Sequence, residues 1–167
     1  MRVQKILCVL MAILVCCTAV SCANKNSIAD TIMDYMDENC GEKDVILYLA
    51  DFTDFKWDKM MIFNYPTSAE EVETALGVKY DNAMDLISGM IFVRDGEIVY
   101  DEIFEHNYVE TAKFYAYPQE EINAKPNYRI FLKEEAYFLA IRNENGEGYY
   151  YRLYPYEGRK GLGQGCA

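Results

Sequence analysis

The chain has 167 residues and a formal net charge of −11 at pH 7, with one histidine, six cysteines and fifteen tyrosines. This length fits one domain with a single hydrophobic core and requires no second domain. The acidic balance excludes the many phosphate contacts of a nucleic-acid-binding protein and opposes binding to anionic lipid headgroups, although solubility alone also explains such a charge. We therefore expect no nucleic-acid partner.

Residues 1–21 have the pattern of an export signal. Arg2 and Lys5 form a short basic region, residues 6–20 carry no charge, and small residues follow at Ala19 and Ser21. The uncharged run is shorter than the roughly 20 apolar residues that a membrane-spanning helix needs. We expect the mature chain to lie outside the cytoplasm, and loss of the two basic residues changes its net charge from −11 to −13.

The segment before Cys22 resembles the lipobox of bacterial lipoproteins. In the order Thr18-Ala19-Val20-Ser21-Cys22, small or aliphatic residues and a serine precede the cysteine, although Ala19 stands where leucine is usual. The resemblance implies cleavage before Cys22 and a diacylglyceryl group on its sulfur, which supplies the two acyl chains that stable anchoring requires. The alternative is an ordinary signal peptide cleaved after Ser21 or after residue 23, which predicts a secreted protein.

Two cysteines remain once the signal and the lipid site are set aside. These are Cys40 and Cys166, and in an oxidising compartment their thiols can pair. Such a disulfide would hold the C-terminal tail near the first helix. A bridge requires Cα atoms within about 7 Å of each other, a separation that the sequence does not reveal, so paired and free thiols both stay open.

Two helices are predicted in the first half of the chain. Ile28, Ile32 and Met36 recur at helical spacing and are followed by Gly41, which favours a helix end there. Further on, Thr67 and Ser68 each have a glutamate three residues later, the pattern of a capping box, and a short helix ending at residue 77 follows from it. Between the helices, apolar runs at residues 45–50 and 60–63 predict two strands joined by a turn.

The second half is predicted to consist of β-hairpins. Asp95-Gly96 separates two apolar segments and suits a two-residue turn. Alternating apolar residues then predict half-buried strands around residues 112–116, 128–132 and 137–141, and Asn145-Gly146 leads into a last strand over 149–154.

These elements predict an α+β fold, with two short helices packed on a curved, mostly antiparallel sheet of about six to eight strands. The expected organisation is a lipoprotein signal peptide at residues 1–21, a tether at 22–27, one domain over 28–156 and a glycine-rich, flexible tail at 157–167.

The run from Asp54 to Ser68, DFKWDKMMIFNYPTS, followed by Glu70-Glu71-Val72 and Leu76-Gly77, resembles a group of small uncharacterised bacterial lipoproteins. They share a D-W-D-K motif, an aliphatic strand, Y-T-S and a short acidic helix ending in L-G. The match covers roughly residues 45–105, and Tyr65-Pro66-Thr67 departs slightly from the shared order. The resemblance supports the fold and export and implies no activity.

Two clusters contain residue types that can carry out chemistry. His106, the single histidine, lies beside Asp101, Glu102 and Glu105, but a metal site needs several converging ligands and a solvated loop explains the cluster better. We expect no metal and no cofactor.

Asp51, Asp54 and Asp58 surround Trp57, a combination that a glycosidase can use when two carboxylates face each other about 5–9 Å apart. Aspartates between strands usually make turns instead, and Trp57 fits either the core or a ligand surface. The sequence therefore favours a protein without enzymatic activity.

The last strand is crowded with tyrosines. Alternation places Tyr149 and Tyr151 on one face and Tyr150, Arg152 and Tyr154 on the other, where they can form a flat aromatic surface for a sugar, a peptide or another protein. The simpler explanation is that tyrosine suits a half-exposed strand.

We expect an acidic, membrane-anchored lipoprotein of the cell envelope, lipidated at Cys22, that binds an envelope protein or glycan through Trp57, Tyr150, Arg152 and Tyr154. The alternatives are an envelope enzyme or inhibitor acting on glycan or peptide, and a structural envelope component.

Overall fold

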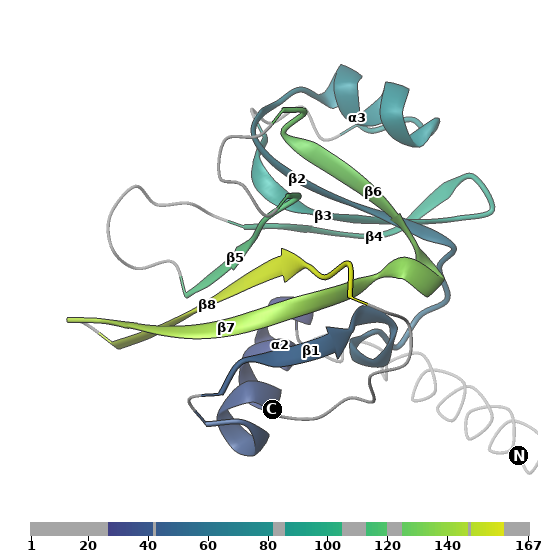
Figure 1. The fold of residues 1–167 in the computed structure, drawn as a ribbon. Helices are drawn as coiled ribbons and strands as arrows, with labels where there is room; N and C mark the ends of the chain where they lie inside the picture. The colour runs from purple at the N-terminus through teal and green to yellow at the C-terminus, as the bar shows by residue number, and fades with distance from the viewer. Residues whose placement is uncertain are drawn as a thin grey trace, which may run out of the picture.

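The computed structural model describes residues 27–41, 43–81, 86–104, 113–119, 125–146 and 148–158. These residues form two α-helices, two 3-10 turns and eight strands in two sheets of four (Figure 1). The helices are α2 (Ile28–Asn39) and α3 (Ala69–Leu76), and the 3-10 turns are η1 (Leu49–Phe52) and η2 (Lys133–Glu135). The strands are β1 (Val45–Tyr48), β2 (Lys59–Thr67), β3 (Leu86–Arg94), β4 (Glu97–Ile103), β5 (Phe114–Ala116), β6 (Tyr128–Leu132), β7 (Tyr137–Asn145) and β8 (Gly148–Pro155).

The predicted α+β class is confirmed, but the strands form two sheets instead of one. Sheet A has the order β1-β7-β8-β5, and sheet B has the order β4-β3-β2-β6. The pairings are antiparallel except that β5 runs parallel to β8. The sheets separate because β1 and β2, predicted as strands joined by a turn, pair with different partners: β1 with β7, and β2 with β3 and β6.

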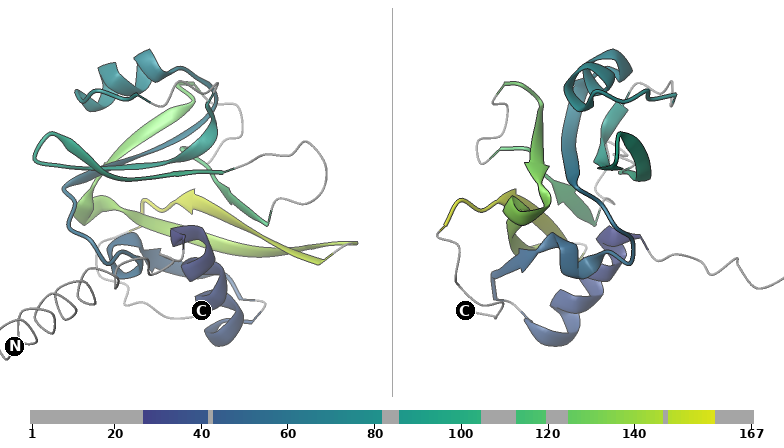
Figure 2. Two further views of the ribbon diagram at one scale, coloured as in Figure 1. Left: turned by 180° about the vertical axis from the view of Figure 1, so that it is seen from behind. Right: turned by 90° about the vertical axis from the view of Figure 1, so that its right-hand side faces the viewer.

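The central strands of sheet B, β2 and β3, are buried on both faces. On β2, Met60 and Ile62 belong to the main core shared with sheet A, whereas Met61 and Phe63 belong to a second cluster with Val72 and Leu76 of α3. Opposite faces of a strand carry alternate residues, so this continuous apolar run fits a strand covered on both sides. The helix α3 therefore covers the outer face of sheet B, and Figure 2 shows α3 and α2 at opposite ends of the molecule.

The described elements cover only one face of sheet A. Its inward residues join the main core together with Ile28, Ile32 and Met36 of α2. On β1 and β8, buried residues alternate with half-buried ones, as expected when one face meets the core and the other meets solvent. We call the face of sheet A that contacts α2 and sheet B its inner face, and the opposite face of sheet A its outer face.

Both helices begin and end as the sequence predicts. In α2, the Ser27 hydroxyl accepts a hydrogen bond from the Asp30 amide at 2.9 Å. In α3, Ser68 and Glu71 form the capping box, and Gly77 ends the helix in the left-handed conformation with φ +69°. The β3–β4 hairpin is also confirmed, with Asp95 and Gly96 both at positive φ.

A strand residue adds a second cap to α2. The Glu102 carboxylate of β4 accepts hydrogen bonds from the backbone amides of Ile28 at 2.9 Å and Ala29 at 3.3 Å, and from the Tyr100 hydroxyl at 2.9 Å. A carboxylate at a helix N-terminus satisfies free amides and interacts favourably with the helix dipole. The N-terminal end of α2 is therefore fixed to sheet B.

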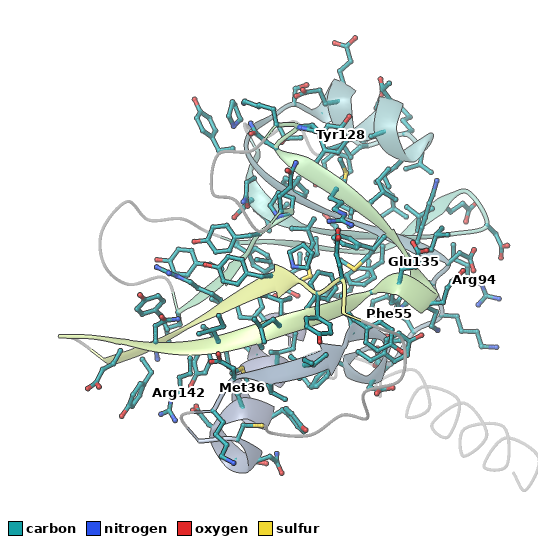
Figure 3. The ribbon with its side chains drawn as sticks, viewed as in Figure 1. Met36, Phe55, Arg94, Tyr128, Glu135 and Arg142 are labelled. Carbon is teal, nitrogen blue, oxygen red and sulfur yellow. The ribbon has the colours of Figure 1, made fainter. Side chains whose placement is uncertain are left out.

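The other end of α2 is fixed to sheet A. The Tyr151 hydroxyl of β8 donates a hydrogen bond to Asp37, whose carboxylate lies 3.5 Å from Arg142 of β7. Arg142 also donates to the Gly41 carbonyl at 2.9 Å and stacks over the Tyr149 ring at 3.6 Å. Figure 3 shows Arg142 on β7 beside α2. Burial, aided by the bond to Asp37, raises the pKa of Tyr151 to about 12.

Within the described part of the chain, neither helix combines the length and apolar composition needed to cross a bilayer.

Candidate functional site

The outer face of β8 carries the residues that the sequence singled out. Tyr151 and Leu153 are buried in the main core, whereas Tyr150, Arg152 and Tyr154 alternate with them and are half-buried. The predicted division of this strand into two faces is therefore confirmed. Tyr149 falls on the inner side but is 43% exposed, because it lies beyond the end of the core.

The neighbouring strand β5 adds two more tyrosines to this face. Phe114 and Ala116 are buried, and the register of β5 places Tyr115 opposite Arg152. Tyr115 and the following Tyr117 therefore lie on the outer side. We call Tyr115, Tyr117, Tyr150, Arg152 and Tyr154 the tyrosine face.

The rings of the tyrosine face pack against one another. Tyr117 stacks on Tyr154 with centroids 4.9 Å apart and planes inclined by 7°. Tyr115 lies nearly parallel to Tyr117 at 6.5 Å and meets Tyr150 edge to face at 6.0 Å. Aromatic pairs in these arrangements stabilise each other and hold a fixed shape. The face is thus an ordered array of rings from two strands.

Arg152 lies among these rings. Its guanidinium carbon is 5.0 Å from the Tyr150 ring centroid, a cation–π distance. Its Nε is buried and has no hydrogen-bond partner. Burial opposes any rise in the pKa of Arg152, but the surrounding Tyr154, Tyr117 and Tyr150 raise it, so the guanidinium stays charged.

The apolar surface continues across sheet A. Leu139 and Ile141 of β7 pair with Tyr154 and Arg152 in register, and both are half-buried. At the β1 end of the outer face, Tyr48 stacks on Tyr137 at 4.8 Å. Neither α2 nor α3 covers this side of the sheet, since both helices pack elsewhere.

Trp57 is not part of this surface. It is 2% exposed, belongs to the main core and meets Phe92 edge to face at 5.2 Å, while its indole N–H donates to the Thr53 hydroxyl at 3.0 Å. Its polar atom is satisfied and its ring is unavailable to a ligand.

One of the aspartates near Trp57 supports a turn. The Asp58 carboxylate accepts a hydrogen bond from the Asp95 amide at 2.9 Å and so supports the β3–β4 turn. Asp51 lies in the first turn of η1, and Asp54 follows it in a bend. Among the described residues, no three His, Cys, Asp or Glu side chains converge as metal ligands.

A pocket of about 440 Å³ opens beside η2. Arg129, Phe131, Glu135, Tyr137 and Glu157 contribute to its lining, and none of Asp51, Asp54 and Asp58 does. Arg129 and Glu157 form an ion pair at 2.8 Å, so their charges satisfy each other within the pocket wall. The pocket is therefore a weaker candidate for a ligand site than the tyrosine face.

Several predicted residues lie outside the described part of the chain, namely Cys22, Glu105, His106 and Cys166. Of the cluster around His106, Glu102 has a structural role as the second cap of α2. Cys40 is disulfide-bonded and is the only cysteine among the described residues, so its partner lies beyond them. Its pairing with Cys166 stays a prediction.

Tyr115 and Tyr117 were missed by the sequence reasoning. Their alternation with Phe114 and Ala116 could have placed them on an exposed face, but the parallel pairing of β5 with a strand so far along the chain has no local signal.

In comparisons with known proteins, no family model, curated protein or solved structure matches this chain. The likeness of roughly residues 45–105 to a lipoprotein group therefore rests on the motifs alone.

Proposed function

We propose that the protein is a lipid-anchored binding domain of the bacterial cell envelope and that the tyrosine face is its docking surface. The observation that carries the proposal is the outer face of sheet A, which the described helices leave uncovered and which holds an ordered array of tyrosines around a charged arginine. Tyrosine and arginine are enriched at binding hot spots because each combines a large contact area with hydrogen-bonding groups.

The position of α2 supports this role. Ser27 and Glu102 fix the first turn of α2, and the chain from Cys22 to Ser27 can extend by at most about 18 Å. The anchor is thus held near the start of α2, and α2 packs on the inner face of sheet A. This arrangement favours an orientation with the tyrosine face turned away from the bilayer, toward an envelope partner.

The tether is tested by intact mass spectrometry of the protein from its native membrane fraction, with Cys22→Ser as the comparison. We expect a chain that starts at Cys22 and carries acyl mass, and we expect the variant to lack that mass. An unmodified start in the wild type would replace the anchored protein with a secreted one.

The docking surface is tested by chemical acetylation of tyrosines on intact cells and on the purified protein. We expect Tyr150 and Tyr154 to react in the purified protein and to be protected on cells, where the partner covers them. Tyr65 is the control, because it is 62% exposed and lies on β2 of the other sheet. Equal reactivity of Tyr150 and Tyr154 in both preparations would show that this face binds nothing in the envelope.

A further inference from the structure

Arg152 differs from the other arginines that the structure describes. Those arginines each lie within ion-pair distance of a carboxylate: Arg94 of Asp95, Arg129 of Glu157 and Arg142 of Asp37. Within the same described residues, no carboxylate pairs with Arg152. A guanidinium without a carboxylate partner is unusual in a chain with a net charge of −11, and the side-chain hydrogen bond of Arg152 is instead with Tyr154.

The surroundings of Arg152 suit an anion that arrives from solvent. Its Nε is buried without a hydrogen-bond partner, as is that of Arg142, so an anion from solvent would meet the terminal amino groups of the guanidinium. Guanidinium groups bind carboxylates through two parallel hydrogen bonds, and the aromatic rings around Arg152 lower the local dielectric and strengthen such a pair.

The tyrosines supply the rest of a binding site. The Tyr117 phenol is protonated at neutral pH and can donate a hydrogen bond, and burial raises its pKa further. The faces of phenol rings carry partial negative charge and attract the C–H groups of a pyranose ring, while the hydroxyl groups match those of a sugar. The Tyr150 ring centroid lies 5.0 Å from the guanidinium carbon, and Tyr115 meets Tyr150 edge to face at 6.0 Å.

From this arrangement, and resting on the proposed docking role, we infer that the tyrosine face binds a saccharide that carries a carboxylate. The carboxylate pairs with Arg152, and the sugar ring lies against the tyrosines.

Other occupants fit less well. Recognition of an extended peptide by strand addition uses backbone groups at a sheet edge, and although β5 is an edge strand among the described strands, the tyrosine face presents side chains. A polyanion such as nucleic acid would meet one cation on this face and the repulsion of a strongly acidic chain. A sugar ring that carries one carboxylate can pair with Arg152 and also pack against the tyrosine rings.

The test is binding of the purified protein to a panel of sugar acids, each compared with its own methyl ester. The panel contains galacturonic, glucuronic, N-acetylmuramic and N-acetylneuraminic acids, and ligand-observed NMR measures the affinities. We expect at least one acid to bind about tenfold more tightly than its ester, because the ester keeps the ring and loses the charge. An acidic peptide is included as a third class of probe.

Variants show whether Arg152 is responsible. Arg152→Gln should abolish the preference for acid over ester, and Arg152→Lys should retain part of it, because lysine keeps the charge but not the planar fork. Arg94→Gln is the matched control and should keep the full preference, since Arg94 lies at the end of β3 outside the tyrosine face. Far-ultraviolet circular dichroism confirms that each variant is folded.

The outcomes separate the inference from the proposed function. Equal binding of acids and esters, or tighter binding of the peptide, would refute the sugar acid and leave the docking surface standing. If no saccharide binds the wild type while Tyr150 and Tyr154 are still protected on cells, the sugar acid is refuted and the docking surface is retained. Loss of that protection would refute the docking surface itself.

Discussion

The second cap of α2 provides a quantitative test of how the domain is held together. Glu102 accepts two backbone amides of the first helical turn and the Tyr100 hydroxyl. Glu102→Ala removes two charge-assisted hydrogen bonds, one of normal length to the Ile28 amide and a longer one to the Ala29 amide. It also removes the negative charge that interacts favourably with the helix N-terminus. Hydrogen bonds to charged groups contribute about 1.5–3 kcal/mol and the dipole about 0.3–1 kcal/mol, and partial exposure reduces both.

We therefore expect Glu102→Ala to lower the free energy of unfolding by about 2–3 kcal/mol and Glu102→Gln by about 1 kcal/mol, because glutamine keeps one acceptor oxygen. Urea denaturation measures the change, and with a typical slope the alanine variant should unfold at about 1–2 M less urea. Hydrogen exchange should accelerate at the amides of Ile28 and Ala29.

The matched control is Glu97→Ala, a glutamate on the same strand that is exposed and outside the α2 contact. A surface substitution of this kind should change stability by less than about 0.5 kcal/mol. If Glu102→Ala and Glu97→Ala shift the urea midpoint equally, the Glu102 carboxylate does not fix α2 to sheet B. It then does not hold the anchor near the start of α2.

Three further substitutions test other parts of the fold. Tyr151→Phe removes the hydroxyl bonded to Asp37 and should lower the free energy of unfolding by about 1–2 kcal/mol, measured by urea denaturation at pH 7. Unchanged stability would mean that this hydrogen bond does not stabilise the fold. Because the folded pKa of Tyr151 is raised above 10, wild-type stability should also fall from about pH 10 to about pH 12, and a variant with the same decline would refute the assignment. Gly89→Ala would place a methyl group against the Glu102 backbone oxygen and should cost about 2–3 kcal/mol, with a tolerated alanine showing that β4 can move aside. Ser68→Ala removes the capping box of α3 and should lower the free energy of unfolding by about 1 kcal/mol, measured by thermal denaturation. An unchanged midpoint temperature would mean that the cap does not stabilise α3.

Local elements of this fold are readable from the sequence because their signals are local. The Ser68–Glu71 box, the Asp95-Gly96 turn and the alternation along β8 each depend on residues a few positions apart, and the structure has all three. The division into two sheets was missed because it depends on which strands pair. Nothing in the apolar runs of β1 and β2 distinguishes adjacent partners from strands of different sheets.

The same distinction decides how much of the candidate site could be predicted. Tyr150, Arg152 and Tyr154 were identified because one strand displays them at a period of two residues. Tyr115 and Tyr117 were missed because β5 reaches β8 by a parallel pairing between distant segments. Trp57 stayed open between the core and a ligand surface because its burial depends on Phe92 of another strand. The property that makes Arg152 interesting, a guanidinium without a carboxylate, is a statement about all its spatial neighbours. It becomes visible only when both strands and their rings are placed together, which is why the ligand inference follows from the structure and not from the tyrosine count.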